Sequence, residues 1–274
     1  MRFRSLKRIT KDGLFKQNLC WSPNGEQILF AQNRAGAFNL CVVNTDGTQF
    51  RQVTATPPDK APRYHPDWSP DGKKIVYVAF TFKGTDGFLH IHTVQPDGKN
   101  DTRIITGPQF NQQPVWSPDG KTIAFTSIRD GKQKIYLADP DGKNIQPLMK
   151  EGNLDQHPHF SPDGKSIVFD SARDGVQSIY TIERATGKVK RLTQGLSADI
   201  YPRWSPDGKS IAFVSRRDGN EEVYLMGIEG DHLTNLTKHP AYDHFPAWRP
   251  DGKALAFVSR RDNVTDIYIA ELEA

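Results

Sequence analysis

The sequence predicts an all-β protein, a six-bladed propeller of four-stranded antiparallel blades, and three observations carry that prediction. An aromatic residue followed by Ser-Pro-Asp-Gly-Lys, with small variations, recurs six times at intervals of 44 to 48 residues. Each interval holds short apolar runs separated by polar turns that contain glycine. The composition is that of an ordinary globular protein, with 36% hydrophobic and 25% charged residues. Strand-rich repeats of this period are typical of propellers. The six copies start at Trp21, Trp68, Trp116, Phe160, Trp204 and Trp248.

The first half of each repeat predicts two strands joined by a tight turn. The innermost strand ends at the aromatic residue, and Ser-Pro-Asp-Gly then predicts a type I turn, with glycine at the residue that needs a positive φ. The second strand carries an aliphatic residue and an aromatic residue two places later, such as Ile211 and Phe213. The residues between and after them, Ala212 and Val214, are also apolar, so both faces of this strand are expected to be buried.

The second half of each repeat predicts two more strands. A polar turn, most often Arg-Asp-Gly, precedes a third strand marked by an aliphatic residue and a tyrosine, and a short fourth strand ends in Leu-Thr. Cys41 and His92 take the place of that tyrosine in the first two repeats. We expect both to be packed residues with no metal or disulfide role. A Cys20–Cys41 disulfide is disfavoured, because innermost and third strands are not neighbours within a blade.

The two ends of the chain predict how the ring closes. The sixth repeat stops after its third strand, and a matching fourth strand is found at the N-terminus. Residues near Leu6 to Thr10 precede Trp21 at the distance that separates Leu236-Thr237 from Trp248. We therefore expect this segment to be the outermost strand of the blade that contains Trp248, which removes an open sheet edge. The sequence then forms a single domain, residues 1–274.

Charge and composition exclude several classes of protein. Lys and Arg number 36 against 32 Asp and Glu, and they are dispersed, so the net charge of +4 gives no case for nucleic acid. No apolar run approaches the roughly 18 residues of a membrane-spanning helix. No apolar stretch follows the basic N-terminus, which predicts a cytoplasmic protein for the chain as given, or a periplasmic one if the chain is a processed form. Two cysteines are too few for a disulfide framework, and we expect a monomer.

The repeat resembles those of TolB-type propellers. The resemblance covers all six copies and is clearest from Asp199 to Thr237, which contains D-x-x-P-x-W-S-P-D-G-K-x-I-A-F-x-S-x-R-D-G. It implies the propeller fold. The same repeat also occurs in propellers attached to serine peptidases and in oligogalacturonate lyases, so the resemblance leaves function open. The peptidase alternative is disfavoured because the sequence lacks the G-x-S-x-G string of the α/β-hydrolase domain.

Comparison of the six copies separates scaffold residues from candidate site residues. The five tryptophans, the aspartates five residues before the aromatic and the Arg-Asp-Gly turns recur, so they are assigned to the scaffold. The segments that lead into the innermost strands differ between copies, and five of the eight histidines fall there: His65, His157, His159, His239 and His244. These segments are expected to gather at one mouth of the central channel. The candidate ligand-binding residues are Tyr64, His65, Gln112, Gln113, Gln156, His157, His159, Tyr201, Arg203 and His244.

The residues at this mouth of the channel are compatible with two functions. The first is a non-enzymatic binding or scaffold propeller that recognises a partner protein or a polar or carbohydrate ligand, with no cofactor and no catalytic residue. The second is a metal-dependent carbohydrate-active enzyme. Oligogalacturonate lyases hold a divalent cation with Gln and His side chains, including a His-Pro-His string, and the resemblance implies that any metal here would be held by Gln156, His157, His159 and His65. In the second repeat, Phe80, Phe82 and Phe88 form either a partner surface or part of the blade packing.

Overall fold

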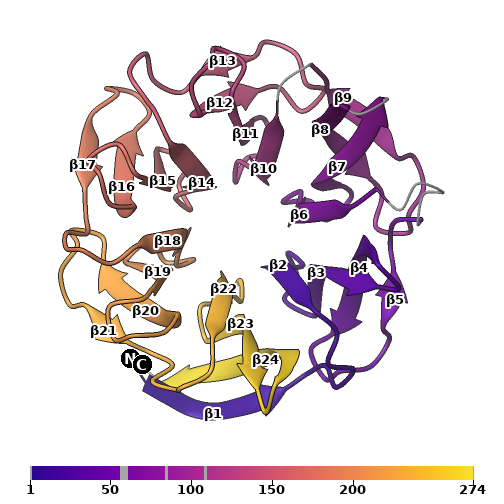
Figure 1. Cartoon of the computed structure of the whole chain (residues 1–274), viewed down its shortest axis with the longest axis vertical. Helices are drawn as coiled ribbons and strands as arrows, with labels where there is room; N and C mark the ends of the chain where they lie inside the picture. The colour runs from indigo at the N-terminus through magenta and orange to yellow at the C-terminus, as the bar shows by residue number, and fades with distance from the viewer. Residues whose placement is uncertain (1, 56–60, 84–85, 108–109, 274) are drawn as a thin grey trace.

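Six four-stranded antiparallel sheets form a closed ring around a central channel (Figure 1). The structure is a computed structural model that describes residues 2–55, 61–83, 86–107 and 110–273. It confirms the predicted all-β, six-bladed propeller. Each sheet follows the sequence from the channel outward, except the last, whose outermost strand comes from the N-terminus. Within the described part of the chain, no helix is long and apolar enough to cross a membrane.

The innermost and second strands occupy the predicted positions in every blade. The innermost strands are β2 (Lys16–Trp21), β6 (Arg63–Trp68), β10 (Asn111–Trp116), β14 (Asp155–Phe160), β18 (Asp199–Trp204) and β22 (Asp243–Trp248). The second strands are β3 (Gln27–Arg34), β7 (Ile75–Lys83), β11 (Ile123–Ser127), β15 (Ser166–Ser171), β19 (Ser210–Ser215) and β23 (Ala254–Arg261). The apolar centres of the second strands are buried on both faces, as their continuous apolar runs predict.

The third and outermost strands complete each blade. The third strands are β4 (Ala37–Asn44), β8 (Asp86–Val94), β12 (Lys134–Ala138), β16 (Ser178–Glu183), β20 (Glu222–Gly227) and β24 (Val264–Glu273). The outermost strands are β5 (Arg51–Gln52), β9 (Thr102–Ile105), β13 (Gln146–Pro147), β17 (Val189–Arg191), β21 (Thr234–Asn235) and β1 (Arg2–Arg8). Five of the six outermost strands have only two to four residues, which limits the exposed edge available for pairing with another chain.

The Ser-Pro-Asp-Gly turns have the geometry that their residues predict. In the fifth blade the Gly208 amide donates to the Ser205 carbonyl at 2.9 Å, and Gly208 has a φ of +69°. The Ser205 hydroxyl donates to the Asp207 carboxylate at 2.6 Å, and that carboxylate also accepts from the Lys209 amide. Each turn therefore satisfies its own polar groups and directs the chain from the innermost strand into the second strand.

The arginine of the Arg-Asp-Gly turn joins the turn to the start of the innermost strand. In the fourth blade Arg173 lies over the rings of Phe169 and Tyr180 and donates to the buried Asp155 carboxylate at 2.6 Å. Arg217 makes the same contacts with Phe213, Tyr224 and Asp199. This recurrence confirms that these residues belong to the scaffold.

The first blade fills the place of the missing tyrosine ring with another residue. Cys41 pairs with Phe30 and is buried, where other blades pair phenylalanine with tyrosine, as in Phe125 and Tyr136. The Phe50 ring lies 6.4 Å from the Phe30 ring, and Arg34 stacks over it. Burial raises the pKa of the Cys41 thiol to about 12, and both Cys20 and Cys41 are free. The prediction that no disulfide joins them is confirmed.

Replacing Cys41 by Tyr is expected to lower the free energy of unfolding by about 1–3 kcal/mol, because the new ring competes with Phe50 for the same space. Urea unfolding measures the change. Adding Phe50→Ala should restore at least half of the loss. The matched control is His92→Tyr, expected to cost less than about 1 kcal/mol, because the His92 ring already lies against Tyr77 and bonds Asp101. A Cys41→Tyr variant as stable as the original protein would contradict this assignment.

The N-terminal strand closes the ring as predicted, although its bounds differ from the expected segment. β1 pairs antiparallel with β24, from Arg2 opposite Glu273 to Arg8 opposite Tyr268. The expected strand, near Leu6 to Thr10, is therefore shifted by several residues. Ile9 still donates its amide to the Ile267 carbonyl at 2.8 Å, so the pairing continues for one residue beyond the strand. Both termini lie beside each other at the outer rim of this blade (Figure 1).

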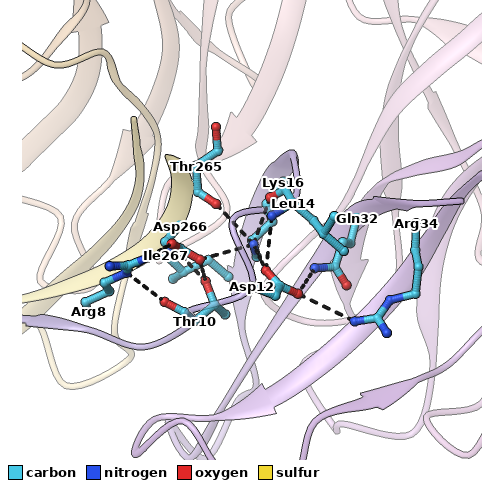
Figure 2. A network of polar contacts seen from close by, with 10 residues as sticks. All are labelled: Arg8, Thr10, Asp12, Leu14, Lys16, Gln32, Arg34, Thr265, Asp266 and Ile267. Atoms are coloured by element: carbon cyan, nitrogen blue, oxygen red, sulfur yellow. Dashed lines mark hydrogen bonds and ion pairs between the residues drawn. The ribbon is translucent and has the colours of Figure 1, made fainter. Parts of the chain in front are cut away.

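A buried network of charges joins the closing blade to the first blade (Figure 2). The fully buried Lys16 ammonium contacts the carboxylates of Asp12 and Asp266 and donates to the Thr265 carbonyl at 3.1 Å. Asp266, also fully buried, accepts from the Thr10 hydroxyl at 2.6 Å and from Arg8 at 2.5 Å. We call this set the closure network. It connects the N-terminal segment, β24 and β2, where the ring is closed.

Candidate functional site

The alternating strand directions give the propeller two distinct faces. All six innermost strands run in the same direction along the channel, from the connection that enters them to the Ser-Pro-Asp-Gly turn. We call the side with the entering connections and the turns between second and third strands the loop face. The opposite side, with the Ser-Pro-Asp-Gly turns, is the turn face. The sequence predicts the ligand site at the loop face.

Every innermost strand contains a bulge at the same position, three residues before the aromatic. The register with the second strand shifts there in all six blades, for example between Gln156 and His159. The bulged residue has a positive φ, between 49° and 57°, although none is glycine. Left-handed residues other than glycine are uncommon, and a bulge re-aims side chains. We call these residues the bulge row: Asn18, His65, Gln113, His157, Tyr201 and Phe245.

His157 is held between two neighbouring polar groups. Its Nε2 lies 2.7 Å from the Gln113 amide nitrogen, and its Nδ1 lies 2.8 Å from an oxygen of Asp170. The Gln113 amide donates to Nε2, so the ring proton is on Nδ1 and is donated to Asp170. The His157 backbone amide also donates to Gln113, at 3.0 Å. These bonds fix the orientation of the imidazole across the boundary between the third and fourth blades.

Sequence comparison missed Asp170, the residue that organises this part of the site. Its fully buried carboxylate accepts from His157, from the side-chain amide of Gln177 and from the Tyr201 backbone amide at 3.1 Å. A comparison of the six repeats distinguishes this aspartate from its counterparts. The equivalent second-strand residues are Ala31, Val78, Thr126, Val214 and Val258. A lone carboxylate at a position that is otherwise uncharged departs from the scaffold pattern and could have been found.

Rings of the bulge row lie against one another in the innermost strands. The His157 ring centroid lies 6.4 Å from that of His65 and 3.8 Å from that of Tyr201. The Tyr201 ring in turn lies 4.9 Å from Phe245 and 4.8 Å from His244. Burial, followed by the neighbouring His157, lowers the pKa of His65 well below its usual value. His65 is therefore neutral at physiological pH.

His244 is held from outside the bulge row. Its Nδ1 lies 2.6 Å from the Glu221 carboxylate, which also accepts from the Arg216 guanidinium. The hydrogen bond from His244 and its positive charge when protonated lower the pKa of Glu221 to about 2, against the effect of burial. Glu221 is thus ionised across the physiological range. His239 lies in the connection before β22, where its Nδ1 accepts from the Ala241 amide.

A cavity of about 440 Å³ occupies the channel and reaches the turn face. All six blades line it, and its lining includes the prolines of all six turns. The residue just before each aromatic also faces it. We call these residues the channel row: Cys20, Asp67, Val115, His159, Arg203 and Ala247. Its volume is within the range of small-ligand pockets.

The ten predicted site residues fall into two groups. Five line the cavity: His65, Gln113, His157, His159 and Arg203. The other five do not: Tyr64, Gln112, Gln156, Tyr201 and His244. Tyr201 and His244 still contact the bulge row, and Tyr64 packs against the His65 ring and the core between the first two blades. The residues lie within the innermost strands, not in loops that enter them as we expected, because each strand continues through its bulge.

The residues implied for a metal offer few free ligand atoms. Both ring nitrogens of His157 already make hydrogen bonds, and the His159 Nδ1 accepts from the Trp204 amide at 3.2 Å. Within residues 2–55, 61–83, 86–107 and 110–273, no group of three or more His, Cys, Asp or Glu residues is arranged to hold a metal ion. A metal at this position stays a prediction, and it requires His157 to exchange a hydrogen bond for the ion.

Exposed apolar side chains gather on the loop face. The large apolar residues that are exposed there are Phe15, Phe82, Phe110, Leu154, Leu196 and Tyr242. Five of them lie in the connections that enter the innermost strands, and Leu196 is 95% exposed. Phe82 is exposed, whereas Phe80 and Phe88 are partly buried, so that group divides between surface and packing. We call these six residues the apolar rim. Each of the six blades contributes one of them.

Comparison with known proteins identifies the repeat. Residues 37–200 and 197–274 match the family described as TolB beta propeller domain. Over 97 residues the chain is 31% identical to the Tol-Pal system protein TolB of Alcanivorax borkumensis, a match that covers 35% of this chain and 21% of that protein.

Solved structures show the same likeness. TolB from Acinetobacter baumannii has a TM-score of 0.77 at 27% identity, over 92% of this chain and 65% of that one. A putative TolB from Agrobacterium tumefaciens has a TM-score of 0.71 at 27% identity, over 82% of this chain and 81% of that one. An oligogalacturonate lyase in complex with manganese has a TM-score of 0.66 at 17% identity, over 100% of this chain and 95% of that one. This likeness shows a shared fold. The chain spans less than two thirds of the Alcanivorax and Acinetobacter proteins.

Proposed function

We propose that this chain, which belongs to the TolB beta propeller domain family, is a non-enzymatic binding module that docks a partner protein on its loop face. The observation that carries the proposal is the apolar rim around the bulge row. Exposed apolar side chains that gather on one face of a soluble domain are typical of protein interaction sites. The TolB relative is named as a protein of the Tol-Pal system, which supports a role within a protein assembly.

The chemistry of the loop face favours a protein over a free sugar. The rim combines phenylalanine, leucine and tyrosine, and aromatic side chains are enriched at protein interfaces. Inside the rim, His157, Tyr201 and His244 offer rigid rings that are held by Asp170 and Glu221. The Tyr201 and His244 rings are half-buried and contact each other, and Tyr201 also contacts the buried His157 ring. An apolar surface around a fixed polar centre suits a partner of complementary shape.

Paired variants on the two faces test this proposal. The loop-face variant is Leu196→Ser with Tyr242→Ser, and the turn-face control is Ile228→Ser with Leu233→Ser; all four side chains are exposed. The partner is captured from the source organism with the original protein, produced separately, and its affinity measured by calorimetry. We expect the loop-face variant to bind at least about tenfold more weakly, because truncating the residues that anchor an interface costs more than about 1 kcal/mol for each anchor. Equal losses in both variants, or a loss in the control alone, would refute docking on the loop face.

A further inference from the structure

The channel row carries chemistry that neither the scaffold nor the loop face uses. The residue just before the aromatic differs in all six blades, and three of these residues carry a carboxylate, an imidazole or a guanidinium: Asp67, His159 and Arg203. All three are half-buried and face the water-accessible cavity. The cavity reaches the turn face, opposite the apolar rim.

Arg203 lies in this cavity as a cation without a paired carboxylate. Its guanidinium donates to the Pro202 carbonyl at 3.0 Å. Among the described residues, no carboxylate oxygen lies within 4.0 Å of it, whereas Arg173 and Arg217 each bond an aspartate. Burial lowers the pKa of Arg203, but a guanidinium stays charged in proteins. Its remaining N–H donors are therefore available to an anion that enters the cavity.

His159 adds a second hydrogen-bond donor beside Arg203. Its Nδ1 accepts from the Trp204 backbone amide at 3.2 Å, and burial lowers its pKa to about 3. The ring is therefore neutral at physiological pH, and with Nδ1 acting as acceptor its proton is on Nε2. His159 and Arg203 come from adjacent strands of the ring, β14 and β18, at the same position. Together they present donors to the cavity.

Apolar side chains form much of the cavity wall beside its polar groups. Five tryptophans, Phe160 and six turn prolines line it, and Trp21 and Trp248 direct their indole N–H groups to backbone carbonyls of the neighbouring blades. An apolar cavity with a few convergent polar groups is the usual form of a small-ligand site. The donors are matched by a carboxylate, which accepts two parallel hydrogen bonds from a guanidinium.

We propose that the channel binds a small carboxylate with an apolar or aromatic body, which enters from the turn face and places its carboxylate on Arg203 and His159. The cavity also reaches His65, Gln113 and His157 of the bulge row, but Arg203 and His159 are not part of the apolar rim, so the inference does not rest on the proposed partner.

Asp67 gives the site a pH dependence. It belongs to the second blade, opposite Arg203 of the fifth, and its Oδ2 accepts from the Trp116 amide at 2.8 Å. Burial raises its pKa to about 7 despite the Trp116 bond and the Arg203 charge, which lower it. The groups facing it are Arg203 of β18 and the Cys20 thiol of β2, while β7 contributes Val76 and β10 a backbone amide. Below pH 7 Asp67 is neutral, and a bound anion is attracted by the positive charge of Arg203. Above pH 7 the Asp67 carboxylate is ionised and repels the anion.

Titration with benzoate, with benzamide as its uncharged counterpart, tests the proposal. Tryptophan fluorescence reports binding because all five tryptophans line the cavity, and ligand-observed NMR provides a second readout. We expect benzoate to bind at pH 6, to bind about tenfold more weakly at pH 8, and benzamide to bind at least about tenfold more weakly at both. Asp67→Asn should bind at pH 8 as tightly as the original protein does at pH 6.

Variants of Arg203 test whether its guanidinium holds the carboxylate. Arg203→Gln should lose benzoate binding, and Arg203→Lys, which keeps the charge but not the fork of donors, should weaken it at least about fivefold. The matched control is Arg2→Gln, an exposed arginine on β1, which should leave binding unchanged. Circular dichroism confirms folding, and the Lys variant provides the test if the Gln variant does not fold. Unchanged binding in both Arg203 variants, or no benzoate binding at millimolar concentration at pH 6, overturns the proposal. Partner affinity at the loop face should be unaffected by either result.

Discussion

Replacing Asp266 by Ala is expected to lower the free energy of unfolding by about 4 kcal/mol, since it leaves the fully buried Lys16 ammonium with Asp12 as its remaining carboxylate partner. The same change frees Arg8 and Thr10, which attach the N-terminal segment to β24. Denaturant unfolding followed by circular dichroism measures the loss. Removing one partner of a buried ion pair typically costs about 3–5 kcal/mol, because the other charge remains buried without compensation.

A matched control and a double substitution isolate the closure network. Asp97→Ala removes an exposed aspartate whose ion pair with Lys99 lies on a hairpin turn, and it should cost less than about 0.5 kcal/mol. Lys16→Met should cost less in the Asp266→Ala background than alone, by about 2 kcal/mol, because the two charges stabilise each other. Additive losses would show that Lys16 and Asp266 are not coupled and would contradict the assigned network.

Replacing Asp170 by Ala is expected to lower the free energy of unfolding by about 3 kcal/mol. The buried carboxylate accepts from three donors, on His157, Gln177 and the Tyr201 backbone, and each loses its partner. A buried polar group left unsatisfied costs about 1–3 kcal/mol, and water from the channel can compensate part of the loss. Asp170→Asn, which keeps the shape and one acceptor oxygen, should cost about half as much. Thermal and denaturant unfolding compare the two variants.

The partner of Asp170 provides the internal check. His157→Ala and Asp170→Ala combined should cost less than the sum of the single changes, because both remove the same hydrogen bond. If the losses simply add, the His157 ring is oriented by other contacts, such as the Tyr201 ring 3.8 Å away. That outcome would contradict the assignment of Asp170 as the residue that orients His157.

The architecture could be predicted because six copies of the repeat show the same pattern of strands and turns. The motif positions, the four strands of a blade and the pairing of the N-terminal segment with the blade of Trp248 are all confirmed. The bounds of β1 differ from the predicted segment because β1 is mostly exposed and so carries only a weak apolar pattern. At Cys41 the sequence predicted only part of the structure. The sequence shows that Cys41 takes the place of the tyrosine, but the ring that fills the space belongs to Phe50, in a connection whose residues differ between the repeats.

The candidate site was only partly predictable, because the backbone conformation of the innermost strands decides which side chains face the channel. The bulge row places non-glycine residues at positive φ, and five of the six are followed by proline, so nothing in their composition signals the left-handed conformation. Without the bulge, Tyr64, Gln112 and Gln156 were as good candidates as their neighbours. Asp170 lies on a second strand, whose residues in the other copies serve the packing of the blade, so the segments that enter the innermost strands give no sign of it. Arg203 was found, but its setting in the channel, away from the loop face, depends on the fold.

Site-specific photo-cross-linking in the source organism tests most directly whether the loop face is the partner-binding surface. p-Benzoylphenylalanine replaces Tyr242 on the loop face or Leu233 near the turn face, two exposed positions with similar exposure of 54% and 44%. The proposal predicts a cross-linked partner protein for position 242 and none for position 233. Cross-linking at position 233 alone, or to the same extent at both positions, would contradict docking on the loop face.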